Sequence, residues 1–242
     1  MKDFALIYEG NDIVAYNKLL FKSFPLSLFG SEDRAVELSC NIKDDVVQQG
    51  RGSVYIFEYN KLQLILRHYH RGGVPAKFNR DKYLWLGLEK TRAIQELEML
   101  SAMRNLGLPV PEPAAARIYK KDLYYQADIV TVLIPDAETL SSSLLSAPLS
   151  EEHWQGIGAT IKRFHEHNCN HADLNAHNIM LGQHGEVYLI DFDKSKINSL
   201  AGKWQANNLD RLKRSLNKLS KNNNNFNYKA LDFSSLMQGY AA

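Results

Sequence analysis

Apolar and polar residues follow two different periodicities along this chain. Short runs rich in β-branched and aromatic residues, bounded by turn residues, predict strands at residues 54–59, 62–67, 114–119 and 123–133. Elsewhere, apolar residues recur at helical spacing over 81–105 and again after Ser150, which is placed to cap a helix that begins with two glutamates. The first half of the chain is therefore expected to be rich in strands and the second half mainly helical.

The predicted helices have apolar faces suited to burial. The apolar residues at helical spacing are Ile94, Leu97, Leu100 and Met103 in the first, Trp154, Ile157, Ile161 and Phe164 in the second, and Leu209, Leu212, Leu216 and Leu219 in a third. The first helix should stop at Gly107, with Pro109 beyond it. We therefore expect an α+β fold in one domain, 1–242, with a small strand-rich lobe (1–134) and a compact, mainly helical lobe (135–242).

The most informative stretch is residues 171–193, HADLNAHNIMLGQHGEVYLIDFD. Two β-rich runs in it flank a turn at 182–185, and together they predict a hairpin. Pairing the arms of this hairpin brings Asp191 back beside Asn178. Asp173 precedes Asn178 in the same loop, so two carboxylates and an amide are predicted to gather at one place.

A carboxylate, an amide and a second carboxylate in this order are typical of phosphoryl transfer. Asp173 is predicted to orient an acceptor hydroxyl and take its proton, while Asn178 and Asp191 hold Mg²⁺ against the phosphates of ATP. Two alternatives stay open on the residues alone. These side chains also occur in ordinary loops and turns, and His171, Asp173 and His177 form a possible zinc site, although no further cysteine or carboxylate pattern completes it.

The strand-rich half carries candidates for nucleotide binding. Gly50 and Gly52 form a turn that would let the backbone approach phosphate oxygens closely, although an ordinary hairpin turn has the same composition. Arg67 ends a predicted strand and suits phosphate with its two parallel donors. Glu96, on the predicted helix, is the expected ion-pair partner of Arg67, with Glu89 and Glu98 as competing choices.

The composition indicates where the protein works more than which reaction it catalyses. The 242 residues are 45% hydrophobic and 23% charged, with a net charge of +2, which gives no indication of nucleic-acid binding. Cys40 and Cys169 lack metal or disulfide spacing, which favours a reducing, cytoplasmic setting. The N-terminal residues do not have the pattern of a signal peptide, and no apolar stretch reaches the length of a membrane span. No obligate protein partner is evident.

Two basic segments indicate an anionic partner. The first, over 67–82, combines arginine, lysine and histidine with two glycines. The second, over 194–229, holds nine basic residues against one acid, Asp210. Its amphipathic helix is suited to an anionic membrane surface, but for the helix itself we favour the alternative of a packed helix with a solvated basic face.

Five blocks of sequence together resemble the 3-deoxy-D-manno-octulosonic acid (Kdo) kinases, which are related to the lipopolysaccharide core heptose kinases. These blocks are RHYHRGG at 67–73, RDKYLW at 80–85, GLEKTRA at 87–93, GLPVP at 107–111 and HADLNAHN at 171–178. The resemblance extends from about Gly50 to Lys194. It implies a protein-kinase-like fold and transfer of the γ-phosphate of ATP, with Mg²⁺, to the 4-hydroxyl of a Kdo residue on lipid A or its precursor.

By matched position, the resemblance makes Asp173 the catalytic base, Asn178 and Asp191 the metal ligands, and Arg67 with Glu96 the pair that positions phosphate. It implies a peripheral enzyme on the cytoplasmic face of the inner membrane in lipopolysaccharide biosynthesis. Ala172 and Asp193 depart from the protein-kinase pattern, which argues against a protein substrate and leaves the role of Asp193 open.

The rival enzymes are small-molecule kinases of the aminoglycoside or choline type, whose cationic acceptors call for an acidic loop that this chain lacks, and a lipopolysaccharide heptose kinase. A non-catalytic kinase-like module is expected to have lost Asp173, Asn178 or Asp191, and all three are present.

Overall fold

The computed structural model describes residues 2–29, 54–70, 81–197 and 202–242. The chain divides into two compact units. Unit 1 contains Met1–Ser101 and Glu112–Leu133, and unit 2 contains Ala102–Pro111 and Ile134–Ala242. That the whole chain works as one two-lobed domain stays a prediction.

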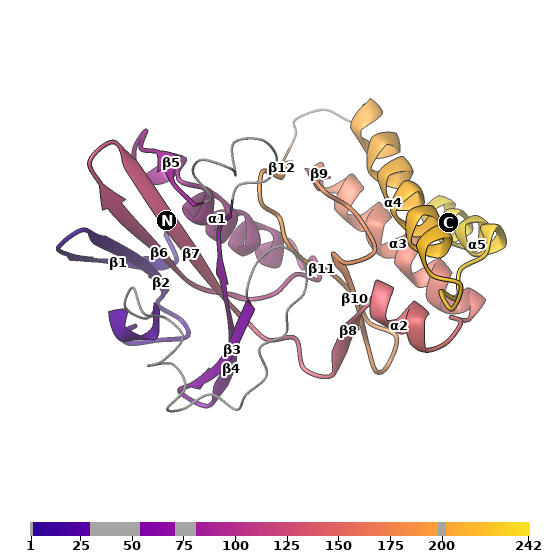
Figure 1. Ribbon diagram of the computed structural model, residues 1–242, viewed down its shortest axis with the longest axis horizontal. Coiled ribbons are helices and arrows are strands. Elements are labelled where there is room, and N and C mark those ends of the chain that lie inside the picture. The colour runs from indigo at the N-terminus through magenta and orange to yellow at the C-terminus, as the bar shows by residue number, and fades with distance from the viewer. Residues whose placement is uncertain (1, 30–53, 71–80, 198–201) are drawn as a thin grey trace. The chain divides into compact units, whose positions relative to one another are not determined.

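Unit 1 is built on an antiparallel sheet of seven strands (Figure 1). Its main path runs β1-β2-β6-β7-β4-β3, and β5 also pairs with β7. The strands are β1 (Phe4–Glu9), β2 (Asp12–Asn17), β3 (Val54–Tyr59), β4 (Leu62–His68), β5 (Tyr83–Leu84), β6 (Pro113–Lys121) and β7 (Tyr124–Val132). The four strands predicted from β-rich runs are confirmed as β3, β4, β6 and β7, with small shifts at their ends.

Strands β1 and β2 were not among the predicted elements. Strand β1 lies at the edge of the sheet and has a mixed pattern, because Phe4 is buried while Leu6 and Tyr8 are 37% and 66% exposed. An edge strand with apolar residues on both faces does not show the clean alternation that marks a half-buried strand.

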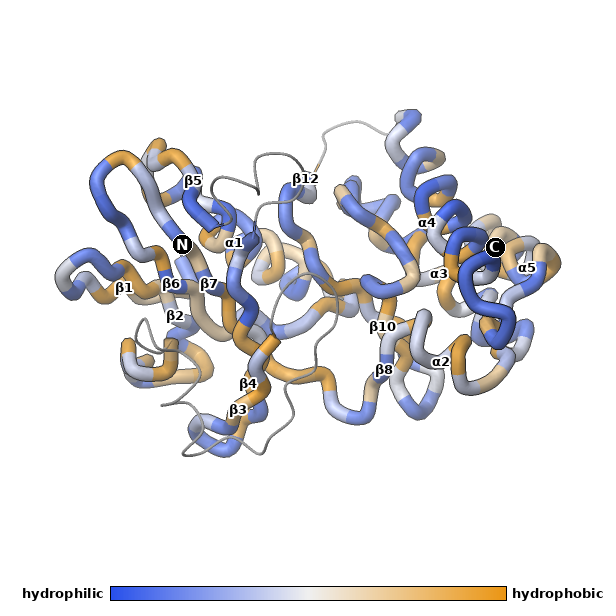
Figure 2. Tube along the Cα trace, viewed as in Figure 1, coloured by the Kyte–Doolittle hydropathy of each residue, from blue (hydrophilic) through white to orange (hydrophobic). Residues whose placement is uncertain are grey.

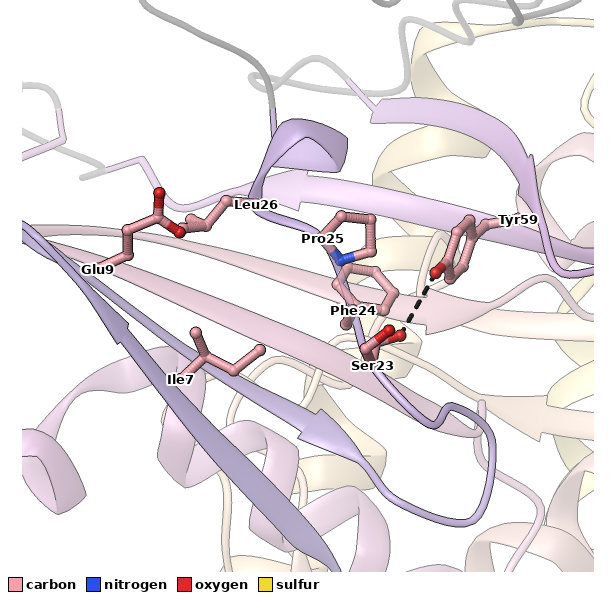
Figure 3. A pocket seen from close by; sticks show the side chains of 7 residues that line it. All are labelled: Ile7, Glu9, Ser23, Phe24, Pro25, Leu26 and Tyr59. Carbon is pink, nitrogen blue, oxygen red and sulfur yellow. Dashed lines mark hydrogen bonds between the residues drawn. The ribbon is translucent and has the colours of Figure 1, made fainter.

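An aromatic cluster fills the core on one side of this sheet. Phe21, Phe24 and Tyr59 lie with their ring centroids 5.1–5.6 Å apart, and Phe29, in the 3₁₀ turn Leu26–Phe29, packs against Phe24. Beside it is a cavity of about 450 Å³ (Figure 3), lined by Ile7, Glu9, Ser23, Phe24, Pro25, Leu26 and Tyr59. The Tyr59 hydroxyl donates to the Ser23 carbonyl at 3.3 Å across its rim. The cluster fastens the turn after β2 to the sheet.

The first helix, α1 (Arg92–Asn105), begins eleven residues later than the prediction of 81. Tyr83 and Leu84 instead pair with β7, and a 3₁₀ turn at Leu88–Lys90 follows Gly87, whose φ of 109° belongs to no helix. The apolar stripe of the helix is buried as expected. Its predicted end is confirmed, because Gly107 adopts a φ of 72° and its N–H donates to the Arg104 carbonyl.

Unit 2 contains most of the helix in the described chain. After the end of α1 come α2 (Leu140–Ser146), α3 (Glu151–Glu166), α4 (Lys203–Asn222) and α5 (Ala230–Ala241). Its strands form two small antiparallel sheets, β11-β10-β8 and β12-β9 (Figure 1). These strands are β8 (Ala137–Thr139), β9 (Cys169–Asn170), β10 (Ile179–Gly182), β11 (Val187–Leu189) and β12 (Lys196–Ile197). The fold is thus mixed α and β with antiparallel sheets, as predicted.

Helix α3 is the core helix of unit 2. Ser150 caps it as predicted, accepting from the His153 N–H at 3.3 Å, and its four predicted core residues are at most 1% exposed. Helix α5, which was not predicted, packs closely against it. A Cβ placed on Gly239 would lie 2.0 Å from the Gln155 carbonyl oxygen, and one on Gly158 would lie 1.9 Å from that of Leu236. Only glycine permits this approach of the two backbones.

Candidate active site

The predicted hairpin is present and sets the geometry of the site. Strands β10 and β11 pair with Ile179 opposite Leu189, and the Ile190 N–H donates to the Asn178 carbonyl at 3.0 Å. This last bond continues the ladder by one step beyond the two strands. It fixes the chain that precedes Asp191 against the end of the loop that holds Asn178, as the turn residues and β-rich runs predicted.

His171 organises the loop from inside. It is 2% exposed, and its Nε2 lies 2.9 Å from the Ile190 carbonyl, so this nitrogen carries the proton. Its Nδ1 then accepts from the Asp173 N–H at 3.2 Å. Burial lowers the pKa of His171, although the carboxylates of Asp191 and Asp173 oppose the shift. The neutral ring thus links the loop to the end of the hairpin and has both carboxylates in its electrostatic environment.

Asp173 presents its carboxylate to solvent while its backbone is held. Its carbonyl accepts from the side-chain amides of Asn175 and Asn178, each at 2.9 Å. Its side chain is 59% exposed, and Oδ1 accepts from Arg211 at 3.0 Å. Within the described residues, Oδ2 has no hydrogen-bond partner. One carboxylate oxygen is therefore held in place and the other is available to an incoming hydroxyl.

Asn178 and Asp191 have the features expected of ligands for a hard cation. The Asn178 side chain is buried, and because its amide nitrogen donates to Asp173, its oxygen is the atom turned to other partners. Asp191 directly follows the end of the hairpin with a φ of 62°, which few residues other than glycine adopt. Strained positions of this kind cluster at functional sites. An amide oxygen and a carboxylate suit Mg²⁺, which keeps several waters and takes its remaining oxygens from phosphate.

Phe192 anchors the segment after Asp191 in the core of unit 2. It is 2% exposed, stacks on Phe164 of α3 with centroids 5.8 Å apart, and lies 4.6 Å from the His171 ring. The Ser195 hydroxyl then accepts from the Ala172 N–H at 3.0 Å. The two halves of the motif are thus fastened to each other and to the helix core at several points.

Helix α4 supports the loop through three polar side chains that sequence reasoning did not identify. Asn208 bonds both backbone groups of His171, at 3.2 and 3.0 Å. Arg211 reaches the Asp173 carboxylate, and the Ser215 hydroxyl accepts from the Ala176 N–H at 3.3 Å. Residues 208, 211 and 215 share one face of a helix. The sequence does show a polar stripe at positions 208, 211 and 215 beside the leucine stripe. The pattern does not show that this stripe contacts the loop.

The predicted ion pair of unit 1 is present. Arg67 Nη2 lies 2.5 Å from Glu96 Oε1, and the Tyr69 hydroxyl donates to Glu96 Oε2 at the same distance. Of the three candidate glutamates, Glu96 is the one that the structure places against Arg67, and its side chain is only 3% exposed. The Arg67 guanidinium also lies over the Tyr69 ring, 5.1 Å from its centroid. The pairing is confirmed, and its role in positioning phosphate stays a prediction.

Several predictions fall outside the described residues. These are Cys40, Gly50, Gly52 and the part of the basic segment at 71–80. The zinc alternative finds no support, because no group of three or more His, Cys, Asp or Glu side chains placed to hold a metal ion occurs in the described part of the chain. His177 instead lies 2.8 Å from the Ser141 hydroxyl through Nδ1. Burial raises the pKa of the Cys169 thiol to about 11, which makes it unreactive.

Comparison with known proteins identifies relatives over most of the chain. Residues 41–240 match the model of the lipopolysaccharide kinase (Kdo/WaaP) family. Proteins named 3-deoxy-D-manno-octulosonic acid kinase are similar to this chain. The one from Vibrio parahaemolyticus is 43% identical over 70% of this chain and 71% of its own length, and the one from Vibrio cholerae is 41% identical over 70% and 72%. The one from Photobacterium profundum is 39% identical over 79% and 80%.

Proposed function

This chain belongs to the lipopolysaccharide kinase (Kdo/WaaP) family, and from that membership we propose that it is a kinase that phosphorylates a Kdo residue in lipopolysaccharide core biosynthesis. The observation that supports this most directly is the loop and hairpin of unit 2, which gather Asp173, Asn178 and Asp191 around His171. We further propose that the phosphate donor is ATP with Mg²⁺, and that the acceptor is the 4-hydroxyl of Kdo on lipid A or its precursor.

In the proposed reaction Asp173 is the general base. The acceptor hydroxyl donates to Asp173 Oδ2, the oxygen that has no partner within the described residues. As the acceptor oxygen forms its bond to the γ-phosphorus, its proton passes to this carboxylate, and the bond from the γ-phosphorus to the bridging oxygen of ADP breaks. Arg211 on Oδ1 and the amides on the Asp173 carbonyl hold the base in its orientation.

Asn178 and Asp191 are the residues proposed to hold Mg²⁺, which when bound would neutralise charge on the phosphates. Both positions are fixed by the protein without the ion. The Asn178 amide nitrogen donates to the Asp173 carbonyl. Asp191 comes directly after Ile190, whose N–H donates to the Asn178 carbonyl. The backbone that carries the two proposed ligands is therefore held in place before nucleotide binds, which limits the cost of ordering it.

Unit 1 is proposed to bind ATP as the small lobe of a protein-kinase-like fold. Arg67 would contact phosphate oxygens, and so would Gly50 and Gly52, which lie outside the described residues. The pairing of Arg67 with a buried glutamate is the support for this role, because it fixes the direction of the guanidinium.

We propose that the enzyme works on an anionic membrane surface, peripherally on the cytoplasmic face of the inner membrane. Helix α4 has six basic residues against one acid and is drawn largely in blue in Figure 2. Arg214, Lys218 and Lys221 are exposed at three- and four-residue spacing, while Leu212 and Leu216 on the other side are fully buried. The packed leucines confirm the alternative of a packed helix with a solvated basic face. That face remains free to meet lipid headgroups. None of the helices that the structure describes is long and apolar enough to cross a membrane.

A substrate panel tests the proposed reaction. The protein is incubated with γ-labelled ATP and Mg²⁺ together with a Kdo-lipid A precursor, free Kdo, an aminoglycoside or choline, and the labelled product is mapped by NMR. Label on the 4-hydroxyl of the lipid-linked Kdo is the expected result. Label on the aminoglycoside or choline alone would overturn the proposal, and label on another Kdo hydroxyl would correct the position.

Vesicle binding tests the membrane surface. Lys218→Gln combined with Lys221→Gln should weaken recovery on vesicles that contain phosphatidylglycerol, by about 1 kcal/mol for each charge removed. The control pair, Lys2→Gln with Lys121→Gln, removes two exposed charges from unit 1. Equal recovery of both pairs would contradict the assignment to α4. Deleting the helix is unsuitable, because its leucines belong to the core of unit 2.

A further inference from the structure

The Asp173–Arg211 pair has an arrangement that its contribution to folding does not explain. Both side chains are about half exposed, at 59% and 48%, and their closest atoms lie 3.0 Å apart. An ion pair this exposed contributes about 0–1 kcal/mol to stability. The other polar side chains on this face of α4, Asn208 and Ser215, already hold the loop through its backbone. Arg211 is therefore not needed to fasten the loop.

The guanidinium of Arg211 has unused capacity beside the base. It donates to Asp173 through Nη1, and no other hydrogen bond of Arg211 occurs within the described residues. An arginine carries five N–H donors in a planar fork that matches a carboxylate or a phosphate. Since Asp173 Oδ2 is the proposed proton acceptor, a guanidinium bound to Oδ1 of the same carboxylate lies close to the hydroxyl that would react.

Resting on the proposed function, we propose that Arg211 selects the acceptor by binding the carboxylate of the sugar acid that Asp173 activates. The name of the relatives' substrate, an octulosonic acid, specifies a carboxyl group on the same sugar as the reacting hydroxyl. A guanidinium shared between that carboxylate and Asp173 holds the two anions apart while it draws the sugar toward the base. A neutral sugar gains nothing from this contact, which makes Arg211 a determinant of specificity as well as a positioning residue.

A cycle of two changes, one in the protein and one in the acceptor, tests this contact. Wild type and Arg211→Gln are each assayed with a Kdo-lipid A precursor in neutral detergent micelles, and with the same acceptor after its Kdo carboxylate has been converted into the methyl ester. For wild type, the ester should raise KM by about 10- to 100-fold, the range for losing a hydrogen bond between charged groups. For Arg211→Gln, KM for the two acceptors should agree within about 3-fold, with KM for ATP unchanged.

Three controls make the result specific. Arg211→Lys keeps the charge without the fork and should retain part of the discrimination. Lys203→Gln removes an exposed charge from the start of the same helix and should behave as wild type. An acceptor stripped of its lipid phosphates should still show the Arg211-dependent preference for the carboxylate.

Each outcome bears on the proposal. An equal loss with acid and ester would show that Arg211 only orients Asp173, a rise in KM for ATP would make it a nucleotide contact, and dependence on the lipid phosphates would assign it to them. Any of these would overturn the inference while leaving the kinase intact. Absence of phosphorylation of the unmodified acceptor by wild type would instead refute the proposed function.

Discussion

Two of the arginine–carboxylate pairs in the described residues, one in each unit, differ in burial, and we propose that this difference separates their functions. In unit 1 the Glu96 side chain is 3% exposed, lies 2.5 Å from Arg67 and also accepts from Tyr69. In unit 2 the Asp173 side chain is 59% exposed and lies 3.0 Å from Arg211. A buried carboxylate with two donors has one geometry and is costly to disturb, whereas an exposed one exchanges partners readily. The first pair suits a fixed part of a nucleotide site and the second suits a site where the proton acceptor meets a changing substrate.

Removing the exposed carboxylate should have the largest effect on the reaction and almost none on folding. We expect Asp173→Ala to lower turnover by about 10²- to 10⁴-fold, the usual contribution of a general base. Its free energy of unfolding should change by less than about 1 kcal/mol, because the pair that it breaks is solvated. Initial rates and thermal melts measure both quantities. A folded variant with undiminished turnover would show that Asp173 is not the base.

Removing the buried carboxylate should have the opposite profile. Glu96→Ala removes the buried carboxylate to which Arg67 and the Tyr69 hydroxyl donate, so we expect the free energy of unfolding to fall by about 2–4 kcal/mol. Glu89→Ala is the matched control, since this exposed residue was the competing choice in the sequence, and it should change stability by less than about 0.5 kcal/mol. Equal denaturation midpoints for the two variants would show that the buried Arg67–Glu96 pair contributes no more to stability than an exposed glutamate does.

A smaller effect, on the free energy of unfolding at acidic pH, should come from the buried His165 of unit 2. His165 is 3% exposed, and burial lowers its pKa from 6.5 to about 4, although a side-chain hydrogen bond with Asn208 opposes the shift. Between these two values the unfolded chain binds the proton and the folded chain does not. The contribution of the neutral His165 to the free energy of unfolding is therefore fully present above about pH 6.5 and is lost as the pH falls toward 4.

Denaturant titrations at several pH values test this contribution. His165→Gln should flatten the pH dependence of the unfolding free energy between pH 6.5 and 4, although it also loses the contact with the Tyr240 hydroxyl. Gln183→Ala alters an exposed residue of the hairpin turn that carries no titratable group and should leave the slope as it is in wild type. A slope that is unchanged in His165→Gln would show that this histidine is not responsible.

The sequence predicted those features that are local or that repeat along the chain. The hairpin followed from its turn residues and β-rich arms, and its pairing brought Asn178 and Asp191 together. The Arg67–Glu96 pair followed from a strand end and a helix, although Glu89 and Glu98 remained alternatives until the structure showed which glutamate lies against the arginine.

Features that depend on distant parts of the chain were missed. The start of α1 was placed too early, because Tyr83 and Leu84 pair with a strand about forty residues away. The support of the loop by Asn208, Arg211 and Ser215 was not predicted, since periodicity shows which face of a helix is polar and does not show what that face contacts. Burial, which distinguishes the two ion pairs, is likewise a tertiary property.

Nucleotide binding tests most directly the claim that the loop and hairpin of unit 2 bring Asp173, Asn178 and Asp191 around one Mg²⁺–nucleotide site. Titration of ATP with and without Mg²⁺ by calorimetry compares wild type, Asp191→Ala and Asp173→Ala. We predict Mg²⁺-dependent binding in wild type, its loss in Asp191→Ala, and affinity within about 3-fold of wild type in Asp173→Ala, because that carboxylate is proposed to serve the acceptor. Undiminished Mg²⁺-dependent binding by Asp191→Ala would contradict it.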